Sequence, residues 1–389
     1  TLPDQVVRGV ELMMSATGAR QGVVAVKAKH KEVVSSLSAL LKGRSDVRLQ
    51  ALGDFYPAGD EFCLVYEVTG KAIPPGGIPI SIGAVVANVE TLRNVAASAE
   101  RPVTDTFLTA AGAVQNPCTL RLPVGTSLAD ALALAGGATC PDFAVLDGGA
   151  MMGRVVTDLS EPLTKTSGGF IVLPKSHALI QRKSAARDVY SRIGRSACDQ
   201  CSFCTEFCPR YLLGYAIEPH KVMRSLSFLG SGKELWSEWA LLCCECSLCS
   251  LYACPESLDP KNVCVSAKAD LRAASRGWKE SNLAQGAPRP VHPMREFRKV
   301  PIPQLILRLG LEDYRADAPL VETGWAPRRV RIPLKQGLGA PAAPVVSVGQ
   351  KVTQGQLLAD VPADKLGARI HASITGTVRS VDSTITIEA

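Results

Sequence analysis

Two short runs of cysteine constrain this 389-residue chain more than any other feature of its sequence. Each run has three cysteines spaced by two residues, a fourth cysteine a little further on, and then a proline. The runs are Cys198-x2-Cys201-x2-Cys204-x3-Cys208 and Cys243-x2-Cys246-x2-Cys249-x4-Cys254. Thiolates at this spacing on a looping backbone can hold three corners of an iron–sulfur cube. The sequence therefore predicts two [4Fe–4S] clusters, which exchange single electrons.

The fourth cysteine of each run is predicted to ligate the cluster of the other run, as it does in ferredoxins that carry two clusters. One cluster is then held by Cys198, Cys201, Cys204 and Cys254. The other is held by Cys243, Cys246, Cys249 and Cys208. Because the second run has one extra residue before its last cysteine, the thiol that closes each cube stays open at this point.

Two other uses of cysteine fit this pattern less well. A disulfide framework is typical of short secreted chains with a signal peptide, whereas this chain has an odd 13 cysteines and no basic-then-apolar leader. Structural zinc suits C-x2-C pairs, but zinc sites usually separate their pairs widely and need no third close cysteine. Cys244 is interpreted as a packed thiol. Four isolated cysteines are interpreted as small buried hydrophobes: Cys63, Cys118, Cys140 and Cys264.

The length of the chain indicates how many domains it holds, and its charge distribution limits the kinds of partner that it can bind. One hydrophobic core rarely grows beyond about 250–300 residues, so this chain is expected to hold several domains. The net charge of +7 is dispersed, without the basic stripes and aromatic platforms of a nucleic-acid reader, so no nucleic-acid partner is predicted. No apolar run reaches the ~18 residues of a membrane span. Abundant unpaired cysteine favours a reducing compartment, the cytoplasm.

The first hundred residues alternate helices and strands. Helices are predicted over 6–16 and 33–41, strands over 22–27 and 47–52, and a strand running into a helix over 83–92. This alternation implies a parallel sheet with helices on its faces and ligands at the carboxyl ends of its strands. Two loops there stand out as site candidates, residues 54–61 and the Pro-Gly-rich residues 73–79.

The rest of the chain changes character three times. Residues 106–114 and 118–123 alternate like a hairpin, and a short helix over 127–135 and a strand over 144–152 follow, a pattern typical of a small α+β module. Residues from about 175 to 285 are helical and hold the cysteine runs. A Pro-rich linker then leads to a tail of short strands and Gly turns, which predicts a small β sandwich. The predicted boundaries are 1–102, 103–157, 158–286 and 287–389.

Several short motifs occur in a characteristic order. They are YPAGDE at 56–61, PGGIP at 75–79, NVETL at 88–92, GGAMMG at 148–153 and the two cysteine runs. In this order they resemble one superfamily, which comprises the flavin-bearing subunit of respiratory complex I, the C subunit of the Rnf complex and the cobalamin reductases of propanediol-utilisation microcompartments. Since the sandwich-like segment lies at the C-terminus here, the chain resembles the cobalamin reductases most, over nearly its whole length.

The resemblance implies a multidomain α+β protein. Its parts are a Rossmann-like α/β domain for FMN and NADH, a soluble-ligand-binding β-grasp domain, a helical ferredoxin-like domain with two [4Fe–4S] clusters, and a C-terminal barrel-sandwich hybrid domain. The implied activity is that of an oxidoreductase that uses NADH, through FMN and the clusters, to reduce cob(III)alamin for a B12-dependent diol dehydratase in a bacterial microcompartment of the cytoplasm. Implied partners are a corrinoid or corrinoid-handling enzyme and microcompartment proteins.

Two other functions stay open. One is an electron relay like the Rnf C subunit, which passes electrons from NADH to a membrane or protein acceptor. The other is a structural iron–sulfur scaffold, which the flavin-loop motifs disfavour. Domain order and the C-terminal sandwich favour the cobalamin reductase over the relay.

By resemblance, six residues are expected near the flavin. Gly59, Asp60 and Glu61 would lie by the isoalloxazine and the nicotinamide, and Val86, Asn88 and Thr91 would line the flavin and its phosphate. Asn88 could equally cap the following helix, and Glu61 could be a solvated acid. The superfamily's Gly-x-Gly-Gly-x-Gly-Phe-Pro loop does not occur in these 389 residues. In the superfamily this loop precedes the point where the sequence begins, so FMN binding is expected to need that upstream segment.

Overall fold

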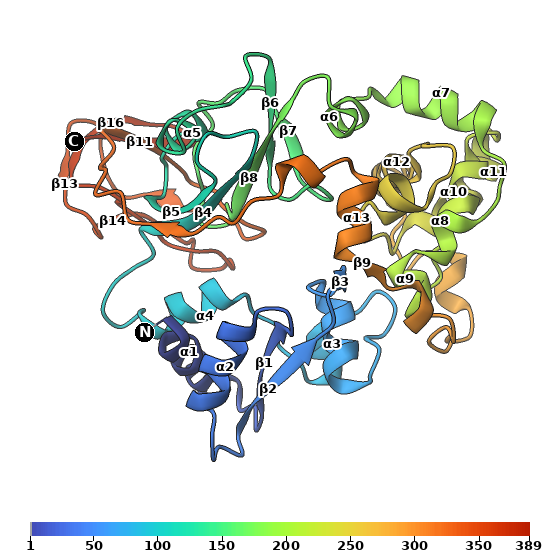
Figure 1. Ribbon diagram of the computed structural model, residues 1–389, viewed down its shortest axis with the longest axis horizontal. Helices are drawn as coiled ribbons and strands as arrows, with labels where there is room; N and C mark the ends of the chain where they lie inside the picture. Colours follow the sequence, from blue (N-terminus) through green and yellow to red (C-terminus); the bar gives the residue numbers. More distant parts are fainter. Residues whose placement is uncertain (1) are drawn as a thin grey trace. The chain divides into compact units, whose positions relative to one another are not determined.

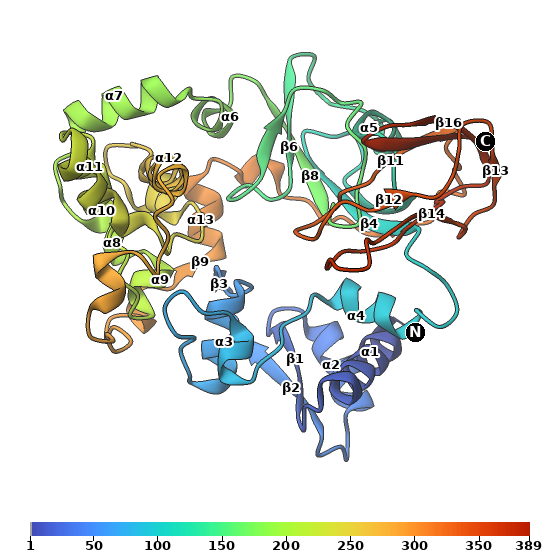
Figure 2. The same ribbon diagram turned by 180° about the vertical axis from the view of Figure 1, so that it is seen from behind.

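A computed structural model describes residues 2–389, and the chain divides into two compact units. The first unit comprises the residues up to Arg93 together with Ala185–Leu311. The second comprises Asn94–Ser184 and Glu312–Ala389. Figures 1 and 2 show the elements of each unit from opposite sides. Each unit combines helices and strands from two separate stretches of chain, so the protein is a multidomain α+β protein, as predicted.

The first unit opens with alternating helices and strands. These are α1 (Leu2–Thr17), β1 (Gly22–Lys27), α2 (Lys31–Leu40) and β2 (Val47–Leu52). Strands β1 and β2 pair in parallel, with Gly22 opposite Val47. Val10, Val24, Leu37 and Val47 are buried together between the helices and the strands. The predicted alternation is confirmed here, and both strands have the predicted bounds.

The strand predicted over 83–88 is wrong. Among the described residues, 84–88 belong to no strand, and α4 (Val89–Ala96) follows them directly. Val85 is 52% exposed rather than buried in a sheet. A strand needs a neighbour for its backbone N–H and C=O groups, and within the described part of the first 93 residues β1 pairs with β2 alone. An apolar run without such a neighbour stays irregular.

Helix α1 approaches α4 closely at Gly9. A Cβ atom at Gly9 would lie 2.1 Å from the carbonyl oxygen of Leu92, so only glycine allows this packing. Gly9→Ala is expected to push the helices apart and to lower the free energy of unfolding by about 1–3 kcal/mol. Denaturant unfolding measures the change. Gln5→Ala, on the exposed side of α1, is the control and should stay within about 0.5 kcal/mol. Equal stability of both variants would contradict this packing.

The remainder of the first unit is helical and carries both cysteine runs. Its helices are α3 (Glu61–Thr69), α7 (Arg187–Ala197), α8 (Phe203–Glu206), α9 (Pro209–Leu212), α10 (Pro219–Ser225), α11 (Gly230–Ser237), α12 (Pro260–Ala273) and α13 (Ile302–Arg308). Proline is the first residue of α9, α10 and α12, where its fixed φ favours the helix and its missing N–H costs nothing. Strand β3 (Phe55–Tyr56) pairs with β9 (Val300–Pro301), which ties the predicted site loop to the chain beyond the cysteine runs.

The second unit contains a mixed six-stranded sheet in the order β10-β5-β4-β8-β6-β7. Its strands are β4 (Asp105–Gly112), β5 (Cys118–Pro123), β6 (Phe143–Asp147), β7 (Arg154–Val156), β8 (Gly169–Pro174) and β10 (Leu320–Val321). Helix α5 (Leu128–Leu134) is capped by Ser127, whose side chain accepts a hydrogen bond from the Asp130 amide. Leu108, Leu120 and Phe170 are fully buried in its core. The predicted hairpin and helix are confirmed.

The domain boundary predicted at 157/158 cuts through this sheet. Strand β8 lies between β4, to which it is parallel, and β6, to which it is antiparallel. Residues 158–184, including helix α6 (Ala178–Lys183), therefore belong to the second unit and not to the helical cluster segment. The boundary predicted at 287 also differs, since the chain up to Leu311 belongs to the first unit. Local patterns mark strands but do not show which strand pairs with which.

The C-terminal part of the second unit consists of two small sheets. One has the order β11-β17-β16-β13 and the other the order β12-β14-β15. Their strands are β11 (Arg329–Pro333), β12 (Ala343–Pro344), β13 (Lys351–Val352), β14 (Leu357–Asp360), β15 (Ile370–His371), β16 (Gly376–Val381) and β17 (Thr384–Glu388). Val330, Leu358, Val378 and Ile385 from both sheets share one buried core. The all-β tail is confirmed.

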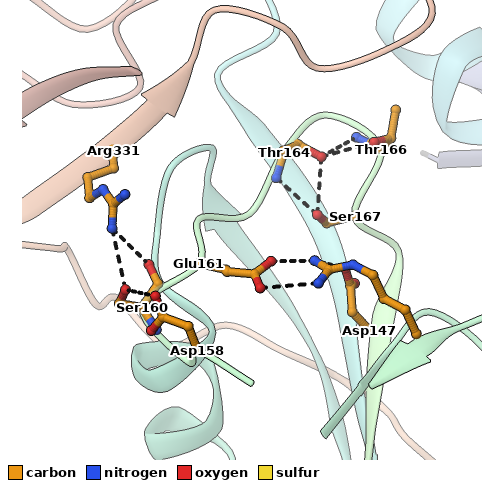
Figure 3. A network of polar contacts seen from close by, with 9 residues as sticks. Asp147, Asp158, Ser160, Glu161, Thr164, Thr166, Ser167 and Arg331 are labelled. Carbon is orange, nitrogen blue, oxygen red and sulfur yellow. Dashed lines mark hydrogen bonds and ion pairs between the residues drawn. The ribbon is translucent and has the colours of Figure 1, made fainter. Parts of the chain in front are cut away.

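Polar contacts fix the long connection between β7 and β8 (Figure 3). Arg154 donates to Glu161 over 3.1 Å and to Asp147 over 3.1 Å. Arg331, in β11, donates to the Ser160 hydroxyl over 3.4 Å. The connection is thus held to the sheet on one side and to the C-terminal strands on the other.

Candidate iron–sulfur and flavin site

The two cysteine runs follow the same backbone path. Gln200 and Ser202 in the first run have φ of 58° and 64°. Glu245 and Ser247, at the same offsets in the second run, have φ of 60° and 67°. Positive φ is uncommon in residues other than glycine. Its recurrence at both offsets shows that the two runs are copies of one loop.

A π-helical turn absorbs the extra residue of the second run. Where the first run has helix α8, the second has a π-helix over Cys249–Ala253. A π turn takes one more residue than an α turn. Cys208 then has φ −71° and ψ 118°, and Cys254 has φ −73° and ψ 116°. Both fourth cysteines therefore occupy equivalent places in spite of their different spacing.

Thiols of the two runs lie near one another in the structure, and Cys198, Cys201, Cys204 and Cys254 line one pocket. Electrostatic contacts join Cys204 to Cys198, Cys201 and Cys254. Others join Cys249 to Cys243, Cys204 and Cys208, and Cys246 to Cys249 and Cys208, so one contact also links the two predicted sets. Cys254 thus lies with the first run, and Cys208 lies with the second. Ligation by these thiols remains a prediction, developed below.

The environment of the thiols fits [4Fe–4S] cubes. The Glu245 amide donates to the Cys243 sulfur and the Leu258 amide to the Cys254 sulfur, both over 3.3 Å. Such N–H···S bonds are one means by which proteins tune clusters. Over residues 2–389 no group of three or more His, Cys, Asp or Glu side chains is arranged to hold a metal ion; a cube is larger and takes its thiolates at four separate corners.

Burial of the thiols differs between the two sets. Cys246, Cys249 and Cys208 are buried, whereas Cys201 of the first run is exposed. Burial raises the pKa of the Cys204 thiol to about 12 and also raises that of Cys249. These thiols are therefore protonated without iron, so taking up a cluster must release protons.

The cysteine-bearing segment contacts the site loops of the first 93 residues. The Tyr56 hydroxyl donates to the Cys246 carbonyl over 2.9 Å. The Tyr215 hydroxyl donates to the Ile73 carbonyl over 2.7 Å. A Cβ at Gly76 would lie 2.2 Å from the ring of Trp278, so that ring packs directly on the Pro-Gly loop. Three separate contacts thus hold both candidate loops against the cluster segment.

A buried ion pair reinforces this junction. Arg210 donates two hydrogen bonds to Asp60, of 2.7 and 2.9 Å. The Arg210 side chain is 8% exposed and that of Asp60 is 18% exposed. Arg210 also stacks over the Phe62 ring at 3.7 Å. A bidentate pair of this geometry fixes orientation as well as distance.

A cavity of about 200 Å³ lies at the junction. Phe62 and Gly77 line it from the first 93 residues, and Arg210, Tyr215 and Cys244 line it from the cluster segment. Cys244, interpreted from the sequence as a packed thiol, lies in the wall of this cavity. A hydrogen bond with Cys246 lowers the pKa of Cys244 to about 7.

The six predicted flavin residues occupy two places. Gly59 and Glu61 are exposed in the loop before α3, and Asp60 is engaged by Arg210 and by the Cys63 amide, so that it caps α3. Asn88 accepts from the Glu90 amide over 2.9 Å at the start of α4. Val86 is half-buried, and Thr91 is exposed. Asn88 thus caps its helix, as its alternative interpretation had it, and flavin contacts by all six residues remain predictions.

Sequence reasoning did not find the pairing of Arg210 with Asp60 or the contact of Tyr215 with Ile73. Cys264 is fully buried, as predicted, and its thiol hydrogen-bonds that of Cys243. Tyr215 carries no local signal. These contacts depend on which segments meet in the folded chain.

Asp54 fixes the site loop to β1 and gives a pH prediction. Its carboxylate pairs with Lys27 over 3.1 Å and with Lys29 over 3.0 Å. Burial would raise the pKa of Asp54, but the two lysines outweigh it, and the pKa is lowered. The stability from this pair is therefore present above the usual Asp pKa of about 4 and is lost as pH falls through the lower folded value.

Asp54→Asn should accordingly lower the melting temperature at neutral pH and have little effect at about pH 2, where the carboxyl is protonated in both states. Thermal unfolding followed from about pH 7 to pH 2 measures this. A variant that loses as much stability in acid as at neutral pH would contradict the pairing.

Four families match successive parts of the chain. They are described as the Nuo51 FMN-binding domain, over residues 1–97, the SLBB domain, over 108–155, a 4Fe-4S dicluster domain, over 197–259, and the RnfC barrel sandwich hybrid domain, over 313–389. A flavin-binding family and an iron–sulfur family thus cover the two segments that meet at the junction.

Two relatives match almost the whole chain. The cobalamin reductase PduS of Citrobacter freundii is 41% identical over 387 residues, which are 99% of this chain and 84% of the relative. The chain belongs to the PduS cobalamin reductase family. The PduS protein of Salmonella typhimurium is 42% identical over 379 residues, 97% of this chain and 82% of that protein. The resemblance found in the motifs is confirmed.

A more distant relative matches about half of the chain. The C subunit of the proton-translocating ferredoxin:NAD(+) oxidoreductase complex of Clostridium ljungdahlii is 29% identical over 212 residues, 54% of this chain and 44% of that protein. In the described part of the chain, no helix combines the length and the apolar character that a membrane crossing requires.

Proposed function

We propose that this protein is an NADH-dependent cobalamin reductase, an oxidoreductase that reduces cob(III)alamin by way of FMN and two [4Fe–4S] clusters. The observation that carries the proposal is the junction between the flavin-family segment and the segment that holds the cysteine runs. Tyr56 bonds to the backbone of Cys246, and Asp60 is locked to Arg210. Electron transfer between two cofactors needs them close and held rigidly, and contacts of this kind support such an arrangement.

The proposal assigns a task to each part. The first hundred residues form a Rossmann-like flavin domain, the six-stranded sheet includes a β-grasp domain, and the tail is a barrel-sandwich domain. When bound, FMN would accept the two electrons of one hydride and allow them to leave one at a time. Its proposed contacts are Gly59, Asp60, Glu61, Val86, Asn88 and Thr91. The proposed cluster ligands are Cys198, Cys201, Cys204 and Cys254 in one set, and Cys243, Cys246, Cys249 and Cys208 in the other.

The acceptor is proposed to approach the first run. The second run is buried against the loops of the flavin-family segment, whereas Cys201 is exposed to solvent. A corrinoid, free or presented by a B12-dependent diol dehydratase in a cytoplasmic microcompartment, can reach that side. The PduS relatives, which match almost full length, support this acceptor. Electron relay to another protein is the second candidate function, because the C subunit of a ferredoxin:NAD(+) oxidoreductase complex matches about half of the chain.

The test uses the full-length natural protein under anaerobic conditions. NADH and cob(III)alamin are added and the visible spectrum is recorded. Conversion to cob(II)alamin, abolished by Cys249→Ala and retained by Cys244→Ala, is the expected result. If NADH bleaches the flavin and the corrinoid stays oxidised, the relay function holds and the cobalamin reductase proposal is rejected.

A further inference from the structure

We propose that Arg210 makes the two cluster sites electrostatically unequal, so that the cluster held by Cys243, Cys246, Cys249 and Cys208 has the higher reduction potential. The inference rests on the proposed function, since it presupposes two clusters. It assigns Arg210 as a positioning and tuning residue that acts on the second set through its charge.

The two cysteine runs differ in charge at one equivalent position. Because the two loops are copies, Cys208-Pro209 corresponds to Cys254-Pro255, and Arg210 corresponds to Glu256. Arg210 is 6% exposed, whereas Glu256 is exposed. The same position therefore carries a buried cation beside one set of thiols and a solvated anion beside the other.

Arg210 is well placed to act on the second set. It follows Cys208 by two residues, interacts electrostatically with the Cys244 thiol, and lines one cavity with Cys243 and Cys244. A guanidinium cannot lose its proton in a protein. Charges buried in this way are screened far less by water and salt than charges at the surface.

The other charges near the two sets do not cancel this difference. Asp60 balances part of the Arg210 charge, and Lys268, bonded to the Cys243 carbonyl over 2.9 Å, is paired with Glu245. Near the first set, Asp199, Glu256 and Arg308 are exposed and therefore screened, and Arg308 reaches the Cys254 carbonyl over 3.3 Å. His220 Nδ1 is hydrogen-bonded to the Thr205 hydroxyl over 2.7 Å.

The sign follows from charge alone. Each cluster becomes more negative when it accepts an electron, so a nearby buried cation favours the reduced form and raises the potential. Net charge around a cluster is one of the established determinants of its potential. Asp60 acts in the opposite sense, because it is an anion that also interacts with the Cys244 thiol.

The experiment is a redox titration of the anaerobically purified full-length protein, followed by EPR. The signal of each cluster is assigned by its loss in Cys204→Ala or in Cys249→Ala. In the wild type, the signal lost in Cys249→Ala should have the higher midpoint. Arg210→Gln should lower that midpoint and leave the other signal unchanged. Arg210→Lys, which keeps the charge, should largely preserve it.

Asp60→Asn and Glu256→Gln complete the test. Asp60→Asn should raise the midpoint that Arg210→Gln lowers, and opposite shifts cannot come from loosened packing. Glu256→Gln should leave the second-set midpoint in place. The inference is overturned if the first-set signal has the higher midpoint, or if both signals move together or not at all. If only one cluster signal is present in the wild type, the proposed function itself fails. If Arg210→Gln does not fold, the test rests on the other two variants: Arg210→Lys should preserve the second-set midpoint and Asp60→Asn should raise it.

Discussion

Replacing Cys249 by alanine is expected to remove about half of the iron of the protein and to leave the other half bound. Cys249 is buried at the start of the π-helical turn and interacts with Cys243, Cys204 and Cys208. Without its thiolate the second set has three ligands, while the first set keeps all four. Iron and sulfide per chain after anaerobic purification, with the visible absorbance, measure the loss.

Cys244→Ala is the matched control. Among the cysteines of residues 243–254, Cys244 is the one that is not a proposed ligand, and its thiol hydrogen-bonds that of Cys246. It should keep its full iron content. If Cys244→Ala lost as much iron as Cys249→Ala, the proposed ligand set would have to be exchanged for one that includes Cys244.

Asp60→Ala is expected to lower the free energy of unfolding by about 3–5 kcal/mol, because it leaves the buried Arg210 without its partner. The variant also removes the cap of α3, where Asp60 accepts from the Cys63 amide over 3.1 Å. Denaturant unfolding of the holoprotein measures the change. Glu61→Ala, the neighbouring exposed acid, is the control and should stay within about 0.5 kcal/mol.

A second substitution separates the ion pair from the cap. Asp60→Asn combined with Arg210→Met removes both charges and keeps a capping side chain, so much of the stability should return. A loss in Asp60→Ala no larger than in Glu61→Ala would mean that the pair contributes nothing.

The sequence predicted the features that depend only on residues close together in the chain. Strand β1 is a largely apolar six-residue run and β2 contains two polar residues in six, Arg48 and Gln50; both lie between turn residues, and their bounds were correct. The spacing of the cysteines carries the cluster chemistry, since ligand geometry depends on that spacing. Ser127 before α5 is a capping signal that needs no tertiary information.

Features that depend on contacts between distant parts of the chain could not be predicted from the sequence. The strand expected before α4 fails because its apolar residues have no neighbouring strand, and β8 joins the sheet of the second unit because it fits between β4 and β6. The pairing of Asp60 with Arg210 spans 150 residues. No local pattern indicates which acid will meet which base over that separation, and the same holds for Tyr56 and Cys246.

The most direct test of the account counts iron in two double variants. If the fourth cysteines are exchanged between the runs, Cys208 and Cys249 serve the same cube although they lie in different runs. Cys208→Ala with Cys249→Ala should then lose one cluster and keep about half of the iron, whereas Cys208→Ala with Cys204→Ala should lose both. The reverse outcome, with the first pair free of iron and the second pair half-loaded, would show that each run closes its own cube and would contradict the account.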